Sequence, residues 1–262
     1  MTDVGATRVH WTRDGAGPPL VLLHGLGGDI SFWDADHERL APDFDVITVD
    51  LRGSGATAGS EELTIGELAE DVRAVLDDAG VQRAHTLGFS LGGLVALELA
   101  LTHPDRVGGL ILASTYARMG AQARRFLDAV LDVYSRGATN RQMYDLIAPW
   151  LFSASFVADP ANAGFFNLTD ADLEDQGRAE WCALYRAQQA FDVTARLGEL
   201  TARTLILTGQ EDHLVSPHDT RVLTNGIGGA QQYVFHAAGH LVNVERPDEF
   251  LDVVRDFLLP SE

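Results

Sequence analysis

A serine at position 90 has neighbours that suit a nucleophile. Residues 84–89 form a short apolar run, and beyond Gly93 the chain changes to helix-forming Leu, Val, Ala and Glu, which predicts a strand, a tight turn and a helix. Small residues at Gly88 and Gly92 suit a sharp turn, because a Cβ there would collide with the strand or the helix. The start of the helix also offers unpaired N–H groups at which an oxyanion could form. An ordinary strand-to-helix loop would fit the same pattern, so the rest of the chain must decide.

The other groups that a serine nucleophile needs stand at the ends of other predicted strands. A serine hydroxyl attacks poorly at neutral pH, so it needs a base, an acid that holds the base in the right tautomer, and donors for the developing oxyanion. Groups that follow parallel strands are expected to lie together, because the carboxyl ends of such strands meet at one edge of the sheet. The candidates are Ser90, Asp212, His240 and the segment 24–26. Their coincidence favours nucleophilic catalysis over an ordinary loop.

Other acidic and imidazole side chains are weaker candidates. Glu211 and Asp219 are alternative acids, but Asp212 has the usual place after its strand. His236 is at a strand end itself and His213 stands beside the acid, so both are expected to be structural or to lie at the rim. The histidines form no His-x-x-His or His-Glu-x-x-His pattern and no cysteine cluster accompanies them, so no metal site is predicted.

Two glycine-rich segments offer a nucleotide site as an alternative. Gly25-x-Gly27 and Gly53-x-Gly55 each match part of a dinucleotide-binding fingerprint, but the third glycine is missing and the following helix is delayed. The first segment is better interpreted as a loop whose backbone approaches a ligand closely, and the second as a rim loop. His24 is expected to hold the first loop by hydrogen bonds rather than to act as a base.

The elements that must position these groups alternate between strands and helices. Apolar or alternating runs predict strands at residues 8–13, 20–23, 43–49, 84–89, 108–113, 204–208 and 231–235. Helical spacing and capping signals predict helices at 31–40, 65–78, 218–226 and 247–259, besides the one after Ser90. This alternation predicts an α/β fold with a mostly parallel, doubly wound sheet that has helices on both faces.

The stretch from about residue 116 to residue 198 breaks the alternation. It contains aromatic-rich amphipathic patterns, which predict helices at 121–135, 141–147, 171–191 and 192–200. We therefore expect a core formed by residues 1–115 and 199–262, with residues 116–198 inserted before the acid-bearing strand as a helical cap, or lid, over the site. Most of the aromatic side chains are expected to pack the helical layer itself.

Composition limits the classes of partner. The 38 acidic and 19 basic residues give a formal charge of −19, which would repel nucleic acid and anionic membrane surfaces, so neither is an expected partner. The single cysteine, Cys182, permits no intrachain disulfide, and the N-terminal sequence has no signal-peptide pattern. No apolar run approaches the roughly 20 residues of a membrane helix, so the cytoplasm is the expected location. The expected partner is a small-molecule substrate, and no pattern predicts an oligomeric state.

Several segments together resemble the α/β-hydrolase fold superfamily, over about residues 9–259. They are His24-Gly25, Asp50-x-Arg52-Gly53-x-Gly55, Gly88-Phe89-Ser90-Leu91-Gly92-Gly93, Gly209-x-x-Asp212 and Gly239-His240. Within the superfamily, segments 88–93 and 238–247 are most similar to 3-oxoadipate enol-lactonase-like carboxylic ester hydrolases. Aminoacrylate hydrolases and C–C bond hydrolases of ring-cleavage pathways are close relatives. The resemblance implies a serine hydrolase that needs no cofactor.

The resemblance also implies a role for each residue. Ser90 would attack a carbonyl carbon, and His240 would take the serine proton and later return it to the leaving group. Asp212 would orient His240 and stabilise its protonated ring. The backbone N–H groups of Leu26 and Leu91 would form the oxyanion hole, which leaves both leucine side chains free to line the pocket.

The predicted reaction is hydrolysis of a small carboxylic ester or lactone through an acyl-enzyme. Cleavage of a C–C bond by the same residues, or a small-ligand receptor without turnover, are the alternatives. The predicted substrate contacts are Gly25, Trp150 and Trp181. A substrate with a free carboxylate would need a cation nearby, for which the sequence offers Arg52, Arg118, Arg124, Arg125 and Arg186. If none of them reaches the pocket, a neutral ester is the better prediction.

Overall fold

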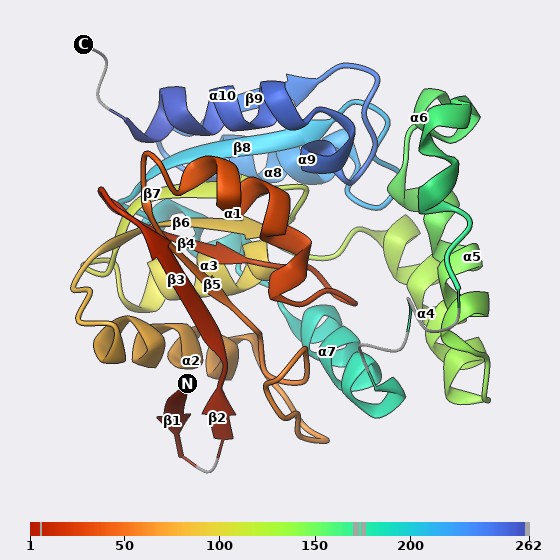
Figure 1. The fold of residues 1–262 in the computed structure, drawn as a ribbon, viewed down its shortest axis with the longest axis horizontal. Helices are drawn as coiled ribbons and strands as arrows, with labels where there is room; N and C mark the ends of the chain where they lie inside the picture. The colour runs from red at the N-terminus through yellow and green to blue at the C-terminus, as the bar shows by residue number, and fades with distance from the viewer. Residues whose placement is uncertain (6, 170–172, 174–176, 260–262) are drawn as a thin grey trace.

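The central sheet has seven strands and is parallel except at one edge. It is seen in a computed structural model, which describes residues 1–5, 7–169, 173 and 177–259. The strands are β3 (Trp11–Gly15), β4 (Pro19–Leu23), β5 (Asp45–Val49), β6 (Ala84–Phe89), β7 (Val107–Ala113), β8 (Arg203–Gly209) and β9 (Gln231–Phe235). Their order is β3-β5-β4-β6-β7-β8-β9, and only β3 runs antiparallel to its neighbour. Strand β6, which leads to Ser90, is therefore the middle strand (Figure 1).

Strand side chains alternate between two apolar layers. In β4, Leu20 and Leu22 pack in one layer, while Val21 and Leu23 pack in the other. A strand that is covered on both faces needs apolar side chains at consecutive positions, which is why these strands have continuous apolar sequences.

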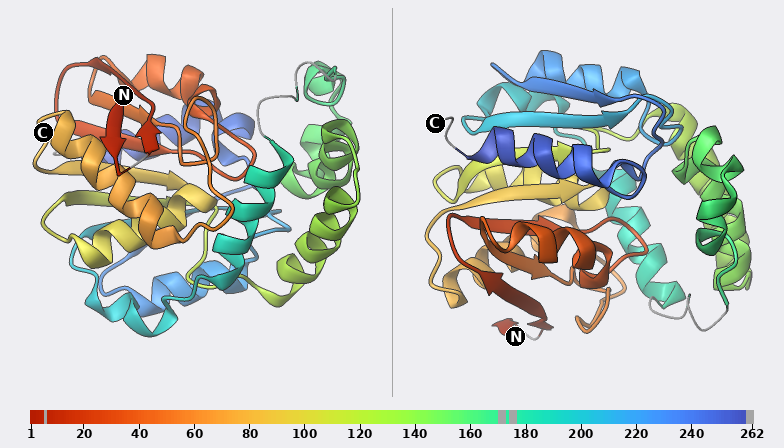
Figure 2. Two further views of the ribbon diagram at one scale, coloured as in Figure 1. Left: turned by 90° about the horizontal axis from the view of Figure 1, so that it is seen from below. Right: turned by 45° about the horizontal axis from the view of Figure 1, so that its top comes forward.

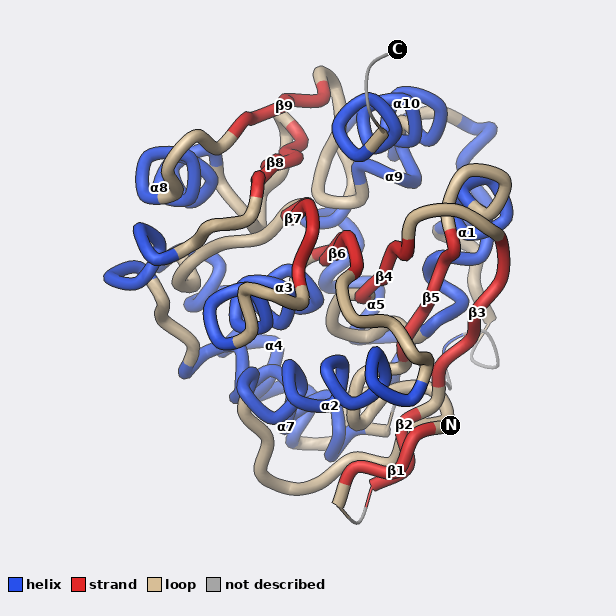
Figure 3. The backbone as a smooth tube through the Cα atoms, turned by 90° about the vertical axis from the view of Figure 1, so that its left-hand side faces the viewer, coloured by secondary structure: helices blue, strands red, loops and turns tan. Residues whose placement is uncertain are grey.

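Helices cover both faces of the sheet. One face carries α2 (Ile65–Asp78), α3 (Leu91–Thr102) and α8 (Pro217–Gly226), and the other carries η1 (Ile30–Trp33), α1 (Asp34–Leu40), α9 (Val242–Glu245) and α10 (Pro247–Leu258) (Figure 3). Helix α2 has the predicted bounds, and Thr64 and Glu67 form the capping box that sets its start. The predicted α/β fold with a mostly parallel, doubly wound sheet is confirmed.

Between β7 and β8 the chain forms a separate helical layer. It comprises α4 (Ala121–Ser135), α5 (Asn140–Leu151), α6 (Ala154–Ala158), the 3₁₀ turn η2 (Pro160–Phe165) and α7 (Arg178–Ala190), before the 3₁₀ turn η4 (Thr194–Glu199) leads into β8. Figure 1 and Figure 2 show α4–α7 beyond the edge at which the parallel strands end. The layer therefore faces the strand ends that precede Ser90, Asp212 and His240.

The N-terminal segment differs from the single edge strand predicted at residues 8–13. Strands β1 (Thr2–Val4) and β2 (Thr7–Val9) form a two-stranded antiparallel sheet of their own, and β3 begins only at Trp11. The break falls at His10, whose backbone N–H donates to Thr57 Oγ1 at 2.9 Å. A side-chain hydroxyl from a distant loop thus takes the place of a strand neighbour.

The helical layer also differs in detail from the prediction. Helix α5 is longer than the predicted 141–147, because it starts at a capping box of Thr139 and Gln142 and continues through Pro149 to Leu151. The sequence did not predict α6 or η2, and the helix predicted at 192–200 is the 3₁₀ turn η4. Of the helix predicted at 171–191, α7 accounts for residues 178–190, while residues 171, 172 and 174–176 lie outside the described part. In the ranges that the structure describes, no helix is long and apolar enough to span a membrane.

Candidate active site

Ser90 occupies a strained turn between the middle strand and α3. Its backbone has φ 51° and ψ −113°, a conformation that residues other than glycine rarely adopt. Neighbouring chain holds the turn on both sides, since the Ser90 N–H donates to Ala113 O at 2.9 Å and the Ser90 carbonyl accepts from Thr115 Oγ1 at 2.7 Å. A strained serine turn between a strand and a helix is typical of a nucleophile elbow.

Two glycines bring this turn against the loop that follows β4. A Cβ on Gly92 would lie 2.2 Å from Leu23 O, so α3 can start against the end of β4 only because position 92 has no side chain. A Cβ on Gly25 would lie 2.9 Å from the Phe89 ring and 3.4 Å from Ser90 Cβ. Gly25 therefore lies directly against Ser90.

His24 and Asp50 hold the loop after β4 in place. His24 is fully buried, and its Nε2 accepts the Leu51 N–H at 3.1 Å, so its proton is on Nδ1, which donates to Gly25 O at 2.8 Å. Burial lowers the pKa of His24, which keeps the ring neutral. Asp50 Oδ1 accepts the Ile30 N–H at 2.8 Å, on the far side of the same loop. His24 thus holds the loop by hydrogen bonds, as predicted.

Asp212 and His240 form a buried hydrogen-bonded pair. His240 Nδ1 lies 2.8 Å from Asp212 Oδ2, and the two residues are only 3% and 4% exposed. Asp212 Oδ1 accepts the backbone N–H groups of Leu214 at 2.9 Å and Val215 at 2.8 Å, which fixes the plane of the carboxylate. Phe89 packs edge-on against the imidazole, with ring centroids 5.0 Å apart. An Nδ1 proton donated to the carboxylate leaves Nε2 free to act as a base.

The alternative acids face other partners. Glu211 accepts the Ala154 N–H at 3.1 Å, and Asp219 belongs to the capping box of α8, in which it accepts the Ser216 N–H at 2.9 Å. His236 is exposed at the surface. Among the acids weighed from the sequence, Asp212 is the one that the fold brings to His240.

The loop that carries His240 is hydrogen-bonded to the end of α5. The His240 N–H donates to Leu151 O at 2.8 Å. The buried Glu245 accepts with Oε1 from the N–H groups of Gly239 at 2.9 Å and Ser153 at 3.0 Å, and with Oε2 from Ser153 Oγ at 2.5 Å. Buried hydrogen bonds therefore join the helical layer to the histidine loop.

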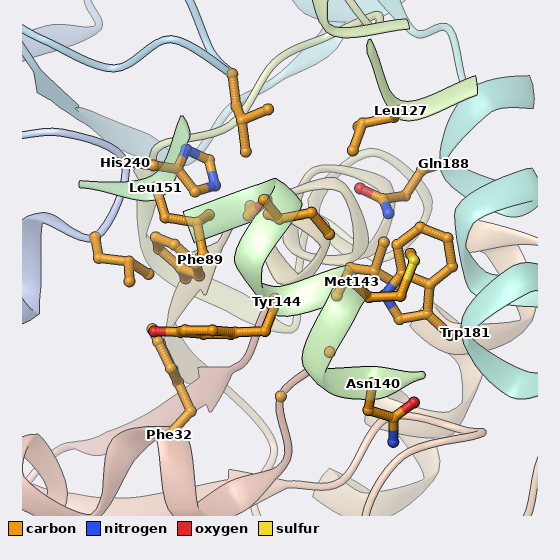
Figure 4. A pocket seen from close by; sticks show the side chains of 18 of the residues that line it. Phe32, Phe89, Leu127, Asn140, Met143, Tyr144, Leu151, Trp181, Gln188 and His240 are labelled. Carbon is orange, nitrogen blue, oxygen red and sulfur yellow. The ribbon is translucent and has the colours of Figure 1, made fainter. Parts of the chain in front are cut away.

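A cavity of about 350 Å³ lies between the strand ends and the helical layer. Its wall contains Ser90 and His240, together with the predicted Gly25, Leu26 and Trp181. Most of the remaining wall is apolar and comes mainly from α5, with further side chains from α4 and from the segments that follow β4, β8 and β9 (Figure 4). The fold thus gathers a serine, a paired histidine and a glycine loop around one apolar space.

Two groups predicted to line the pocket lie elsewhere. The Trp150 indole stacks on Phe126 of α4, with centroids 4.1 Å apart, and His213 approaches its edge, so Trp150 is a packing residue of the helical layer and not part of the described cavity wall. The Leu91 side chain is fully buried in the core, so the expectation that it would be free to line the pocket is wrong. Leu26 does line the cavity. The Leu91 N–H, at the first residue of α3, has no acceptor within the helix.

The described part of the cavity wall offers no arginine or lysine to a substrate carboxylate. The sequence contains no lysine, and no arginine is among the described residues of the wall. Arg52 instead donates twice to Asp71, at 2.8 and 2.5 Å, Arg118 lies 3.9 Å from Asp192, and Arg124 donates to a backbone carbonyl of α7 at 2.6 Å. Arg125 and Arg186 are likewise absent from the wall.

Sequence reasoning assigned no role to three groups at the site: the Leu151 carbonyl, Glu245 and Gln188. A backbone carbonyl leaves no signal in a sequence. Glu245 lies in segment 238–247, which carries part of the family resemblance. That resemblance was the one sequence signal that could have pointed to Glu245. Gln188 belongs to an amphipathic helix without a motif, and only the fold places it on the cavity wall.

A parallel sheet whose middle strand leads into a serine turn, with an aspartate and a histidine after two later strands, defines the class of α/β hydrolases. The family described as "alpha/beta hydrolase fold" matches residues 18–247. The chain belongs to this α/β-hydrolase family, which confirms the resemblance.

Relatives match over almost the whole chain. "Putative carbamate hydrolase RutD" of Variovorax paradoxus (strain S110) is 32% identical over 95% of this chain and 94% of the relative. "2-hydroxy-6-oxo-6-phenylhexa-2,4-dienoate hydrolase" of Comamonas testosteroni is 29% identical over 98% and 93%. Among solved structures, the enol-lactonase from Burkholderia xenovorans LB400 has a TM-score of 0.85 at 28% identity and 98% coverage of both chains. The expectation of a hydrolase with enol-lactonase-like relatives is confirmed.

Proposed function

We propose that the protein hydrolyses a small, uncharged carboxylic ester or lactone through an acyl-enzyme on Ser90. The observation that carries the proposal is the buried hydrogen bond of 2.8 Å between Asp212 and His240, with His240 and Ser90 on the wall of one cavity. Activation of a serine hydroxyl requires a base that an acid orients and that shares the serine's cavity.

In the first half-reaction, His240 Nε2 takes the Ser90 Oγ proton as Oγ bonds to the carbonyl carbon of the substrate. The carbonyl oxygen becomes an oxyanion, which accepts from the N–H groups of Leu26 and Leu91; one such donor contributes roughly 10²–10³ in rate. His240 then gives the proton to the leaving oxygen, the C–O bond breaks, and the acyl group stays on Ser90. In the second half-reaction, His240 deprotonates a water that attacks the acyl carbon. A carboxylic acid forms, and Oγ recovers its proton.

Asp212 acts through His240. Its carboxylate accepts the Nδ1 proton, which keeps Nε2 unprotonated before attack, and its negative charge stabilises the imidazolium that forms afterwards. The N–H groups of Leu214 and Val215 hold the carboxylate in the orientation that this requires.

Residues 116–198 serve as a cap over the site, and residues 1–115 and 199–262 form the core. The cavity wall draws Ser90 and His240 from the core, and Met143 and Trp181 from the helical layer, so a bound substrate is enclosed between the two. A cavity of about 350 Å³ suits a small ligand.

The residues of the cavity wall favour an uncharged substrate over a charged one. A carboxylate buried without a cation loses its hydration and gains no compensating ion pair, which costs several kcal/mol or more. An enol-lactone that carries a free carboxylate therefore fits this cavity less well than a neutral ester or lactone does.

Hydrolysis of a C–C bond is the second candidate. It is favoured by the similarity to the Comamonas relative, whose name gives a dienoate as its substrate. The same serine, histidine and aspartate would serve that reaction. The described wall residues include no arginine, which favours the ester or lactone, because a dienoate carries a carboxylate.

The test compares p-nitrophenyl butanoate with p-nitrophenyl hemisuccinate, whose acyl chain ends in a carboxylate, and adds neutral lactones. We expect hydrolysis of the neutral ester, with kcat/KM at least about tenfold above that of the hemisuccinate, since about 1.4 kcal/mol already corresponds to tenfold. Ser90→Ala should reduce the rate to background, while Ser31→Ala, at an exposed position, should not. Ligand binding without hydrolysis by the intact protein would favour a receptor, and a preferred hemisuccinate would exclude the uncharged class.

A further inference from the structure

Gln188 presents a buried amide that the reaction above does not use. It lies on α7, is 3% exposed, and forms part of the cavity wall with its amide directed inwards (Figure 4). Its Nε2 has no hydrogen-bond partner among the described residues. A buried donor without an acceptor is destabilising, so an acceptor supplied by a ligand would relieve the cost.

Tyr116 determines which way the amide faces. Its hydroxyl donates to Gln188 Oε1 at 3.3 Å. Burial raises the pKa of Tyr116, so the hydroxyl keeps its proton throughout the neutral range. Because the hydroxyl has one proton to give and the amide oxygen accepts it, the N–H groups of Gln188 remain for another acceptor.

The other amide and the phenol hydroxyls on the wall already have partners. Tyr134 OH donates to Asn140 Oδ1 at 2.6 Å, and Asn140 Nδ2 donates to Leu173 O at 2.5 Å. Tyr144 OH donates to Phe165 O at 2.7 Å. Asn140 keeps a second Nδ2–H group, but among these side chains Gln188 Nε2 is the one donor atom that has no hydrogen-bond partner in the described residues.

We propose that Gln188 is a specificity-determining residue, which donates a hydrogen bond to a second acceptor oxygen on the uncharged ester or lactone. This rests on the proposed function and narrows its substrate class to esters and lactones with a further carbonyl or ether oxygen. An amide is a neutral donor, so it can satisfy a carbonyl or ether oxygen but cannot neutralise a carboxylate.

Tyr116 connects Gln188 to the strand end that lies beside the serine turn. Tyr116 directly follows Thr115, whose Oγ1 donates to Ser90 O at 2.7 Å, and its own hydroxyl reaches Gln188. Ser90 and Gln188 line the same cavity, so we expect the subsite to take an oxygen that is a few bonds from the reacting carbonyl, on its acyl or its alcohol side.

The test uses two matched ester pairs with the wild type and Gln188→Met. Ethyl butanoate and ethyl 3-oxobutanoate differ by an acceptor oxygen on the acyl side, and butyl acetate and 2-methoxyethyl acetate differ by one on the alcohol side. For each pair, kcat/KM of the ester with the additional oxygen is divided by kcat/KM of its apolar partner. This ratio is compared between the wild type and the variant, so that the intrinsic reactivity of the esters cancels. We expect Gln188→Met to lower the ratio about five- to 100-fold in at least one pair, the range for an unpaired buried donor. The variant should still hydrolyse the apolar esters.

Gln189→Met is the matched control. Gln189 is the next residue of α7, and its Nε2 donates to Asp128 Oδ1 at 2.6 Å. Its variant should keep both wild-type ratios. Ratios in Gln188→Met that equal the wild-type ratios in both pairs would overturn the proposal. If Gln188→Met does not fold, Gln188→Leu provides the same comparison.

Calorimetric binding of the same esters to Ser90→Ala, with and without Gln188→Met, separates this inference from the proposed function. We expect the oxygen-bearing member of one pair to lose about fivefold or more in affinity on substitution, relative to its apolar partner. If the wild type hydrolyses no ester, the proposed function fails, and the binding ratios alone decide the role of Gln188. Unchanged binding ratios would contradict that role.

Discussion

The backbone N–H of His240 donates a hydrogen bond of 2.8 Å to the carbonyl of Leu151. The loop that follows β9 and carries His240 is therefore bonded to the last turn of α5. Glu245 strengthens this link, because its Oε1 accepts from both Gly239 of the loop and Ser153 beyond α5. The helical layer that encloses the cavity therefore also fixes the backbone from which His240 projects.

Replacement of Glu245 should affect both stability and turnover. Glu245→Ala leaves two buried N–H groups and a buried hydroxyl without their acceptor, so we expect the free energy of unfolding to fall by about 2–4 kcal/mol and kcat to fall as the loop shifts. Glu245→Gln keeps an acceptor oxygen for the N–H groups and should remain closer to the wild type. Chemical denaturation and ester hydrolysis measure the two effects. An alanine variant with wild-type stability and kcat would show that this link is unimportant.

Asp212→Asn should remove most of the turnover and leave the fold intact. The asparagine amide would donate toward His240 and favour the wrong tautomer, which costs roughly 10⁴ in kcat for such a triad. Glu211→Gln is the control, since Glu211 accepts from Ala154 and not from His240. Steady-state kinetics with circular dichroism distinguish a lost acid from a lost fold. Near-normal kcat in Asp212→Asn would mean that another group orients the base.

Asp36 should make stability depend on pH. Burial is the main cause that raises the pKa of Asp36 from 3.8 to about 6, against the opposing effects of Asn243 and Arg39. The folded chain therefore binds this proton more tightly than the unfolded chain does. The resulting stabilisation is present at low pH and is lost as pH rises through about 6, a change of about 3 kcal/mol for a shift of roughly two units.

Asp36→Asn should remove that dependence. An asparagine carries no charge to desolvate, and it can pair with Asn243, whose Oδ1 has no partner among the described residues. We expect the variant to gain stability over the wild type as pH rises from about 4 to about 8, measured as denaturation midpoints at each pH. Asp34→Asn, at an exposed position of the same helix, controls for the loss of one negative charge. A stability difference between Asp36→Asn and the wild type that does not change with pH would contradict the assigned pKa.

Gly92→Ala should disrupt the serine turn. The added methyl would lie 2.2 Å from Leu23 O, which forces α3 away from β4, so we expect a loss of about 3 kcal/mol or more and of activity. Gly66→Ala is the matched control, because its nearest neighbour would be 3.9 Å away, and it should stabilise α2 by up to about 1 kcal/mol. Thermal unfolding with an activity assay tests both. Equal effects of the two substitutions would contradict a requirement for close approach at position 92.

The sequence could predict what is set by local pattern. The helix at 65–78 has both a capping box and an apolar stripe, and its bounds match α2. Asp212 and His240 could be paired in advance, because parallel strand ends meet at one edge of the sheet. The mostly parallel sheet could be predicted from the strand–helix alternation, because a helix between two strands returns the chain to the same edge of the sheet.

Features set by distant contacts could not be predicted. The strand break at His10 depends on a hydroxyl of Thr57, which is 47 residues away in the chain. The packing of Trp150 against α4 and the position of Gln188 on the cavity wall depend on how the helices of the insertion pack. A tryptophan or a glutamine in an amphipathic pattern does not indicate which side will face a ligand.

Covalent labelling of Ser90 tests the proposed chemistry most directly. A fluorophosphonate probe reacts with a serine whose hydroxyl is activated by a base, and the adduct is read by intact mass and peptide mapping. We expect one adduct on the wild type at Ser90, none on Ser90→Ala, and a large loss of labelling rate in His240→Ala. An unlabelled, folded wild-type protein, or an adduct that persists in Ser90→Ala, would contradict the assignment of Ser90 as the nucleophile.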